Sequence, residues 1–336
     1  MGEELVSVIV VNWNGKEYLG PCLSSLLAQT YRYYEIILVD NGSTDGSIAY
    51  VQRHFPEVRI IANASNIGFA AANNIAIRTT SGEYVATLNN DAVAHPCWLE
   101  ELVASAKADE DVGMIASKIL FHHRKDMIDS AGITVDKAGM AWNLQHGERD
   151  DGQTEDQLEV FGACAAAALY RRAMLDEVGL FDEDFFAYHE DVDLAWRARL
   201  LRWRCLYNPR AIVYHIHSAT GTEGSPFKNY LLGRNKVWTV AKNYPIPELF
   251  FYLPIIISYD LAAVLFHLAK GDASPLKGRV AGLLGLSKAL RKRWEIQSRR
   301  RVRFPALAEL ISPLEILRRQ QRHQGLVTGG GARSRG

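Results

Sequence analysis

The chain has 336 residues, with 38 basic and 38 acidic side chains, and 48% of its residues are hydrophobic. This length and apolar content suffice for the core of one large α/β domain or of two smaller ones. The four cysteines are scattered without paired or metal-type spacing, which excludes a disulfide framework and indicates reduced thiols in a cytosolic protein. The first residues, MGEELVSVIVVN, lack a basic segment and a cleavage site, so we expect no signal peptide.

Apolar runs and helical spacing alternate along the first third of the chain. The runs predict strands at 5–11, 36–39, 58–62 and 84–88, and the 3.6-residue spacing predicts helices at 18–29, 47–54, 69–78 and 98–108. Alternation of this kind predicts a mostly parallel sheet with helices on both faces.

Polar side chains stand where three of these strands end: Asn12, Asp40 and the triplet Asn89-Asn90-Asp91. Ligands of open α/β sheets bind at the carboxyl ends of the strands. Three successive ends that carry Asn or Asp therefore predict a shared site. The alternative is that these residues only form turns, which Asn and Asp favour.

Asp91 is the one acid of its triplet. A carboxylate at a strand end is well placed to bind Mg²⁺ or Mn²⁺, which prefer oxygen ligands and share them with phosphates. His215 and His217 hold alternate positions after a predicted strand at 211–214, so they point the same way and either can join Asp91 on a metal. The alternative is a hydrogen-bonded histidine without metal.

Three acids, Glu190, Asp191 and Asp193, stand directly before a helix-like run that ends near Leu201, after an aromatic stretch that starts at Phe185. They are candidates for catalysis. The alternative is an ordinary amphipathic helix with acids at its start, where the helix dipole favours negative charge.

Two common nucleotide-binding motifs and the α/β-hydrolase motif are missing from the sequence. No G-x-G-x-x-G and no phosphate-binding G-x-x-x-x-G-K-[ST] follows the first strand, and no G-x-S-x-G occurs. This excludes a dinucleotide dehydrogenase, a P-loop kinase and an α/β-hydrolase.

Residues 121–160 lose the periodicity and carry four glycines among charges. We expect an irregular excursion with a hairpin, forming an acceptor-side flap. Beyond it the pattern predicts strands at 161–170, 204–207 and 211–214 and helices at 172–178 and 227–243.

The stretch 249–268 is strongly apolar but is interrupted by Pro254, Asp260 and His267. A spanning helix needs about 20 apolar residues with few charges, so we favour association in the plane of the bilayer or as a re-entrant segment. The alternatives are a full span and a helical hairpin packed against the rest of the protein.

The end of the chain is basic. From Lys288 onward there are thirteen Lys or Arg residues and three glutamates. Such a tail fits an anionic membrane surface or a nucleic acid. The apolar stretch before it favours the membrane, where each cation contributes about 1 kcal/mol, and we expect no nucleic-acid partner.

The ordered motifs VSVIVVNWNG, ILVDNGSTDGS, NIGFAAANN, LNNDA, FDEDFFAYHEDVDLAWRAR and YHIHSATG resemble those of the inverting family 2 glycosyltransferases, and most closely their rhamnosyltransferase-like branch. The resemblance covers residues 7–242. It implies the GT-A fold: a Rossmann-like nucleotide-diphospho-sugar transferase with a mixed, mostly parallel sheet flanked by helices. From the apolar and basic stretches beyond residue 243 we expect, in addition, a C-terminal helical, membrane-associated extension.

The resemblance also implies roles for particular residues. Asp91 matches the last acid of the family's D-x-D metal motif, although Asn89 stands where the first acid is often found, and His215 resembles a histidine that completes the Mg²⁺ or Mn²⁺ shell. The residues that resemble the nucleotide-sugar-binding set are Asn12, Asp40, Asn41, Asn66, Gly68, Phe69, Asn73, Asn74, Asn90 and Asp91.

In the acidic segment, Asp191 is similar to the general base, with Glu190 beside it. Trp196 and Tyr188 are predicted to shape the acceptor subsite. The pair Arg234-Asn235, on the helix predicted at 227–243, is placed to face a diphosphate, by its charge and position.

We therefore expect a catalytic domain at 1–243, with a nucleotide-binding half at 1–118 and an acceptor half at 119–243, a membrane-associating region at 244–325 and a disordered tail at 326–336. The predicted function is inverting transfer of a sugar, foremost L-rhamnose from dTDP-rhamnose, to a lipid-linked or polysaccharide acceptor at the cytoplasmic face of the cell membrane. The alternatives are UDP-galactofuranose, UDP-glucose or UDP-N-acetylglucosamine as donor, and a non-catalytic nucleotide-sugar-binding scaffold.

Overall fold

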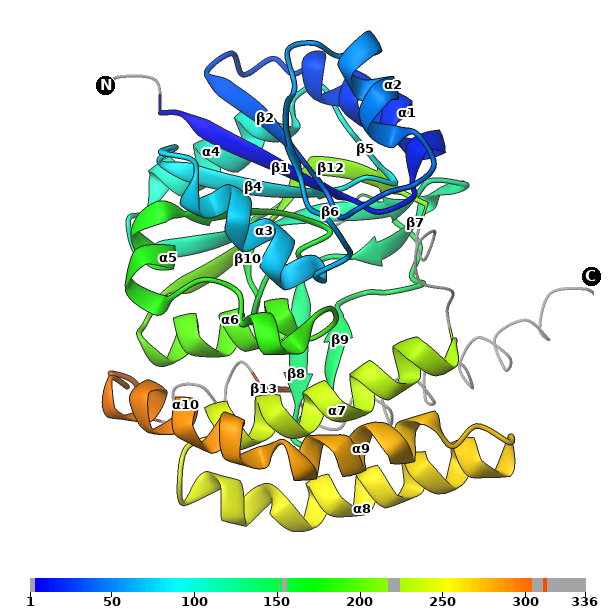
Figure 1. The fold of residues 1–336 in the computed structure, drawn as a ribbon. Helices are drawn as coiled ribbons and strands as arrows, with labels where there is room; N and C mark the ends of the chain where they lie inside the picture. The colour runs from blue at the N-terminus through cyan, green and yellow to red at the C-terminus, as the bar shows by residue number, and fades with distance from the viewer. Residues whose placement is uncertain (1–3, 151, 153–155, 217–223, 304–310, 313–336) are drawn as a thin grey trace, which may run out of the picture.

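The structure is a computed structural model that describes residues 4–150, 152, 156–216, 224–303 and 311–312. Within them, a ten-stranded sheet has the order β10-β12-β6-β11-β4-β1-β2-β3, with β5 paired to β12 and β7 to β6 (Figure 1). Its strands are β1 (Val6–Asn12), β2 (Tyr34–Asp40), β3 (Arg59–Ala62), β4 (Tyr84–Asn89), β5 (Ala92–Ala94), β6 (Val112–Phe121), β7 (Arg124–Ser130), β10 (Leu158–Glu159), β11 (Ala167–Arg171) and β12 (Arg204–His215).

The first four strands run parallel, as the alternation of strands and helices predicts. In the register of β1 with its two neighbours, Asn12 pairs with Asp40 and Val11 pairs with Asn89. The carboxyl ends of β1, β2 and β4 therefore meet at one edge of the sheet. Both faces of these strands are covered, which is why their sequences are continuous apolar runs.

Helices cover both faces of the sheet. One apolar core joins the sheet to α1 (Lys16–Leu27), α2 (Ser47–His54) and α4 (Trp98–Ala108). The other joins it to α3 (Phe69–Arg78), α5 (Arg172–Val178) and α6 (Glu190–Leu200), which follows the short 3-10 turn η1 (Glu183–Phe185). The predicted bounds of α2, α3, α4 and α5 are confirmed.

Three strand predictions need correction. The long strand β6 follows α4. No strand was predicted there, because Ser117 and Lys118 interrupt the apolar pattern. Lys118 is buried and pairs with Asp150 at 3.0 Å. The strand predicted at 161–170 is the shorter β11, which runs antiparallel between β4 and β6. The two strands predicted at 204–207 and 211–214 are one strand, β12, with a register shift between Asn208 and Ile212, which is typical of a bulge.

The predicted hairpin of the excursion is confirmed. β7 folds back on β6, and a second small sheet has the order β13-β8-β9, with β8 (Ile133–Asp136), β9 (Ala141–Asn143) and β13 (Ile311–Ser312).

Four C-terminal helices form a layer on the α6 side of the molecule, far from β1 and β2 (Figure 1): α7 (Pro226–Asn243), α8 (Glu248–Ala269), α9 (Ser274–Leu284) and α10 (Leu286–Ser298). α9 packs closely on α7 because it presents glycines. A Cβ at Gly278 would lie 2.1 Å from the carbonyl oxygen of Tyr230, and one at Gly282 would lie 2.9 Å from the Val237 side chain.

The apolar helix α8 has 22 residues and is long and apolar enough to cross a membrane. Asp260, one of the interruptions of its sequence, faces the protein: its Oδ1 lies 2.8 Å from Lys236 Nζ and 2.7 Å from an Arg279 guanidinium nitrogen. Val264 is buried on that side, whereas Leu261 is 60% exposed. α8 therefore has one face on α7 and α9 and another that is apolar and exposed.

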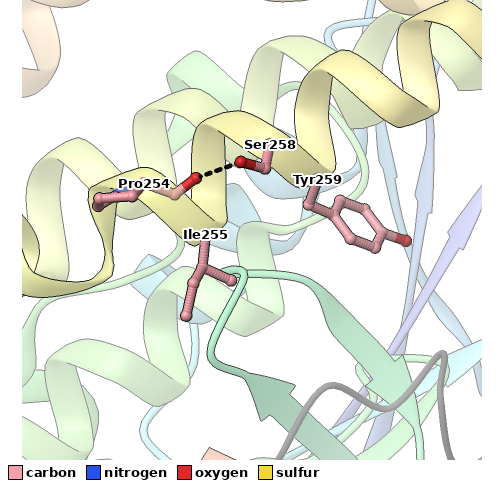
Figure 2. Close-up of a pocket in the computed structure, with 4 residues that line it drawn as sticks. All are labelled: Pro254, Ile255, Ser258 and Tyr259. Atoms are coloured by element: carbon pink, nitrogen blue, oxygen red, sulfur yellow. Dashed lines mark hydrogen bonds between the residues drawn. The ribbon is translucent and has the colours of Figure 1, made fainter.

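A surface pocket of about 430 Å³ lies on α8, lined by Pro254, Ile255, Ser258 and Tyr259. In Figure 2 the Ile255 and Tyr259 side chains project from the same side of the helix, and the Ser258 hydroxyl donates to the Pro254 carbonyl oxygen at 2.8 Å. The lining holds no acid and no histidine, so this pocket lacks the groups that the predicted chemistry requires.

Candidate active site

The polar residues at the ends of β1, β2 and β4 form one buried hydrogen-bonded chain. Asn90 donates to Asn12 Oδ1 at 2.8 Å, and Asn12 donates to Asp40 Oδ2 at 2.9 Å. The other oxygen of Asp40 accepts from the Ser43 backbone N–H at 2.8 Å. The prediction that these strand ends meet is confirmed, whereas the contacts of these residues with a nucleotide stay a prediction.

The predicted donor segment lies beside this chain. The Asn41 amide donates to the Gly68 carbonyl oxygen at 3.2 Å, and Asn66 Oδ1 accepts from the Gly68 N–H at 2.9 Å. Gly68 has a φ of +91°, and a Cβ there would lie 2.6 Å from Phe186, so the position requires glycine. Phe69 begins α3 directly after it.

The side chains of Asn73 and Asn74 form hydrogen bonds within the protein. Asn73 donates to the Phe69 carbonyl oxygen of its own helix at 2.9 Å. Asn74 is fully buried, donates to the Phe181 carbonyl oxygen at 2.7 Å and accepts from the Phe181 N–H at 3.1 Å. Its side chain ties α3 to the segment before α6, and the roles of Asn73 and Asn74 toward a donor stay predictions.

Asp91 and His215 come together, as predicted. His215 Nε2 lies 3.1 Å from Asp91 Oδ1, and His215 Nδ1 lies 2.8 Å from Asp129 Oδ2. All three side chains are buried. Burial opposes the imidazolium form, but the carboxylates of Asp129 and Asp91 outweigh it and raise the pKa of His215 to about 9. His217 lies outside the described residues.

These residues fit a divalent cation in part. Among the described residues no cluster of three or more His, Cys, Asp or Glu side chains is arranged to hold a metal ion. Asp91 and His215 could supply two ligands, and Asp129 lies 2.8 Å from the second nitrogen of His215, which is the usual support of a metal-binding histidine. A cation bound here takes its remaining ligands from elsewhere, as Mg²⁺ does from substrate phosphates.

Asp191 stands at the start of α6, at the β11 side of the sheet. Its Oδ2 accepts from the Ala165 N–H at 3.2 Å and its Oδ1 from the Val192 N–H at 2.8 Å. Burial raises the pKa of Asp191, and these bonds oppose the rise. Burial and the nearby Asp191 carboxylate raise the pKa of Glu190 well above its usual range.

The three acids of α6 do not form an ordinary solvent-exposed cap. α6 is buried along almost its whole length, and its first flanking residue, His189, makes no side-chain capping bond. Asp193 is fully buried and lies 2.8 Å from Arg197 Nε and 2.7 Å from Lys242 Nζ. Burial opposes its ionisation, but these cations hold the pKa of Asp193 well below its usual range. The surface ion pair that the i,i+4 spacing suggests is instead a buried one.

Two further predicted site residues belong to the framework. Trp196 has no exposed surface and packs against Phe161 and Tyr244. Arg234 donates to the Phe185 carbonyl oxygen at 2.8 Å. The roles of Trp196 toward an acceptor and of Arg234 toward a diphosphate stay predictions. Tyr188 is half-buried two residues before Glu190, and its role toward an acceptor stays a prediction.

Asp129 is a site residue that the sequence analysis did not identify. This acid lies in β7, within the stretch predicted to be irregular, and is 86 residues from its partner His215. A strand prediction at 124–130 would have placed it next to β6 but could not have paired it with a histidine on β12.

Comparisons with known proteins identify the family and the fold. The family model "Glycosyl transferase family 2" matches residues 7–179, just over half of the chain. The O-antigen biosynthesis protein RfbC of Myxococcus xanthus is 32% identical over 243 residues, which are 69% of this chain and 19% of that protein. The N-acetylglucosaminyl-diphospho-decaprenol L-rhamnosyltransferase of Mycobacterium tuberculosis H37Rv is 28% identical over 251 residues, 66% of this chain and 79% of that protein.

Among solved structures, a mannosyltransferase of Pyrobaculum calidifontis in complex with GDP-Man and Mn²⁺ is similar with a TM-score of 0.54 and 20% identity, over 88% of each chain. GalNAc-T7 with UDP, GalNAc and Mn²⁺ is similar with a TM-score of 0.56 and 16% identity, over 81% of this chain and 58% of that one. Both likenesses concern the fold. The chain spans about a fifth of the length of RfbC and most of the rhamnosyltransferase. By its family match and its fold, the chain belongs to glycosyl transferase family 2, with the GT-A architecture.

Proposed function

We propose that this chain is an inverting glycosyltransferase in which Asp191 is the general base. The observation that supports this most is the pair Glu190 and Asp191 at the start of α6, where burial raises both pKa values. A base whose pKa is raised toward neutral pH accepts a proton most effectively. The alternative, a capped helix end, does not require a buried Glu190 next to a half-buried Asp191.

The reaction follows from these roles. The acceptor hydroxyl gives its proton to the Asp191 carboxylate while its oxygen forms a bond to the anomeric carbon of the sugar. The bond from that carbon to the diphosphate oxygen breaks, and the nucleoside diphosphate leaves with the electron pair. Because there is one displacement from the face opposite the leaving group, the configuration at the anomeric carbon inverts.

Asp91 and His215 are the residues that would hold a divalent cation. When bound, Mn²⁺ or Mg²⁺ would neutralise charge on the departing diphosphate. The nucleoside would be bound by four residues at the strand ends: Asn12, Asp40, Asn41 and Asn66. Hydrogen bonds link these residues to one another or to Gly68 and Ser43.

For the donor, we propose dTDP-L-rhamnose first, because a relative that aligns over most of its length is named a rhamnosyltransferase. The same relative's name supports a lipid-linked acceptor, and the name of RfbC supports a polysaccharide. UDP-galactofuranose, UDP-glucose and UDP-N-acetylglucosamine are the alternative donors.

Membrane association is the second part of the proposal. On the outer side of α8, Phe251, Leu261 and Leu265 are 76%, 60% and 66% exposed, and Trp294 of the basic helix α10 is 78% exposed. Asp260 turns inward to Lys236 and Arg279, so α8 is suited to lie in the plane of an anionic bilayer. We propose that the protein acts from the cytoplasm, at the inner face of the cell membrane, with 1–243 as its catalytic part and 244–325 as its membrane-associating part.

The direct test is a panel of nucleotide sugars, each incubated with Mn²⁺ or Mg²⁺ and a prenyl-diphosphate-linked sugar. Release of nucleoside diphosphate and the anomeric configuration of the product, read by NMR, name the donor and the stereochemistry. Retained configuration would contradict the single-displacement mechanism. Thermal stabilisation by a nucleotide without turnover of any donor would favour the non-catalytic scaffold.

A further inference from the structure

The segment 185–189 connects η1 to α6 and leads directly into Glu190 and Asp191. Its backbone is unusual. Phe186, Tyr188 and His189 have φ values of +66°, +66° and +69°, in the left-handed region that residues with a Cβ rarely adopt. Such conformations persist only where the surroundings hold them, and they concentrate at functional sites.

One side chain of α7, that of Asn235, bonds to three residues of this segment. The Asn235 amide nitrogen donates toward three backbone carbonyl oxygens: Phe185 at 3.0 Å, Ala187 at 2.8 Å and Tyr188 at 2.7 Å. Asn235 has no exposed surface. An amide nitrogen carries two hydrogens, so three carbonyls share two donors, and all of them face one point on α7.

Arg234 orients that amide and extends its reach. Its Nε donates to Asn235 Oδ1 at 2.9 Å, and one of its terminal nitrogens donates to the Phe185 carbonyl oxygen at 2.8 Å and the Asp184 carbonyl oxygen at 3.2 Å. The direction of the Asn235 amide is therefore fixed, with its oxygen toward Arg234 and its nitrogen toward the segment.

The other side of the segment meets the predicted donor site. The Ala70 N–H, in the first turn of α3, donates to the Phe186 carbonyl oxygen at 3.2 Å, and Phe186 is the neighbour that leaves room only for glycine at position 68. The segment 185–189 thus lies between the start of α3 and α7, with the candidate base at its end.

We propose that Asn235 is a positioning residue for this reaction: by holding the backbone of 185–189 in its left-handed conformation, it aims the Asp191 carboxylate at the acceptor hydroxyl. The Asn235 amide nitrogen bonds to backbone carbonyl oxygens of the segment, so Asn235 acts through the segment and does not touch the reacting atoms. The inference rests on the proposed role of Asp191 and adds a residue outside the part of the chain that the family model matches.

The test compares Asn235→Ala with Asn243→Ala. Asn243 is the matched control because it lies on the same helix, is equally buried, and uses its amide on Asp193 Oδ1 and the Thr239 carbonyl oxygen instead of on the segment. Both variants lose a buried amide, so both are expected to melt at a lower temperature. Only Asn235→Ala is expected to lower kcat, by about 10- to 100-fold, since misplacement of a reacting group by about 1 Å reduces rates on the order of 100-fold.

Donor binding separates positioning from general damage. The Kd for the nucleoside diphosphate, measured by titration calorimetry, is expected to change less than about threefold in Asn235→Ala, because ground-state binding does not use the base. Should the alanine variant not fold, Asn235→Ser, which keeps one hydroxyl donor, is measured in its place, and its kcat is expected to be lower than that of Asn243→Ala.

A kcat for the Asn235 variant within about twofold of that for Asn243→Ala would overturn the inference. So would a loss of nucleotide affinity as large as the loss of kcat, because the role would then be structural. Neither result bears on the base itself: an active Asp191→Asn protein would refute the proposed mechanism, whereas an inactive one with an unimpaired Asn235→Ala protein would refute only the positioning role.

Discussion

At the scale of single residues, Asp191 and Asp193 show how different surroundings shift the pKa of the same side chain in opposite directions. Both are aspartates on one turn of α6, yet burial raises the pKa of Asp191 whereas Lys242 and Arg197 keep Asp193 ionised. A carboxylate locked between two cations is a poor proton acceptor. Asp191 has no such cation among the causes of its pKa shift, and in the proposed mechanism its carboxylate would accept the proton of the substrate hydroxyl.

The first prediction concerns the base. Asp191→Asn keeps the size of the side chain but cannot accept the proton, so kcat is expected to fall by about 10²- to 10⁴-fold, the usual contribution of a general base. The nucleoside diphosphate Kd, measured by calorimetry, stays within a few-fold of that of the unchanged protein. Near-normal turnover by Asp191→Asn would show that Asp191 is not the general base.

Asp129 is predicted to control the metal affinity of His215. Loss of a carboxylate that supports a ligating histidine weakens metal binding by about 10- to 100-fold, and Asp129→Asn should do so for Mn²⁺ titrated in the presence of nucleoside diphosphate. Asp126→Asn, an acid-to-amide change in the same strand at an exposed ion pair with Arg149, is the control. Equal Mn²⁺ affinity in both variants would show that Asp129 does not support the ligand.

The same triad predicts a pH dependence of stability in the metal-free protein. The pKa of His215 is raised from 6.5 to about 9. Protonation therefore stabilises the fold fully below pH about 6.5, and this stabilisation is lost as pH rises through about 9. It amounts to at most about 3–4 kcal/mol, because one pKa unit corresponds to about 1.4 kcal/mol.

Urea unfolding between pH 6 and 10 measures this contribution. The free energy of unfolding of the unchanged protein is expected to fall across that range more steeply than that of Asp129→Asn, which lacks one of the two carboxylates. Parallel curves for the two proteins would contradict the raised pKa.

At the scale of elements, α7 links the two halves of the molecule. One side of it carries Asn235 and Lys242, which contact the segment before α6 and Asp193. The other side receives α9 at backbone distance, through Gly278 and Gly282. Small residues allow helices to approach this closely, and any added Cβ must move one of them.

Gly278→Ala is accordingly predicted to destabilise the C-terminal layer. The new Cβ would meet the Tyr230 carbonyl oxygen at 2.1 Å, and overpacking of this kind costs about 1–3 kcal/mol. Val280→Ala, two residues along the same helix at a position that is 47% exposed, is expected to change the free energy of unfolding by less than about 0.5 kcal/mol. Chemical denaturation of both variants tests this, and equal effects would mean that α9 does not pack on α7 as described.

At the scale of the whole molecule, apolar and basic surfaces lie together on the C-terminal layer. α8 exposes Phe250, Phe251 and Leu265, and α10 exposes Trp294 together with Arg291. A soluble monomer rarely leaves so many large apolar side chains in water on one layer. The basic residues nearby make an anionic bilayer the partner that fits both features.

The corresponding prediction is that the full chain co-sediments with vesicles that contain phosphatidylglycerol, and less well with vesicles of phosphatidylcholine alone. Replacing Phe251 and Leu265 by serine should weaken binding to both kinds of vesicle, because apolar burial is lost. Leu99→Val, in the core of the catalytic half, serves as the control for general destabilisation. Undiminished binding of the double serine variant would show that α8 is not the membrane-contacting face.

The sequence by itself determined the parts of this protein that depend on local order. β-branched runs and 3.6-residue spacing placed β1 to β4 and the helices α2, α3 and α4, because hydrophobic periodicity is a property of neighbouring residues. Asn12, Asp40 and Asp91 were identifiable because parallel strands bring their carboxyl ends to one edge. The order of the motifs pointed to the family that the comparisons then confirmed.

The tertiary structure alone decided which side chains meet. Asp129 finds His215 across 86 residues, and Asn235 finds the segment 185–189 across about 50. Arg234 and Trp196 have types that suit a binding site, yet one bonds to backbone carbonyls and the other fills the core. The pKa of a group depends on its burial and on charged side chains that are close in space but far apart in sequence. The spacing of residues along the chain does not reveal these contacts.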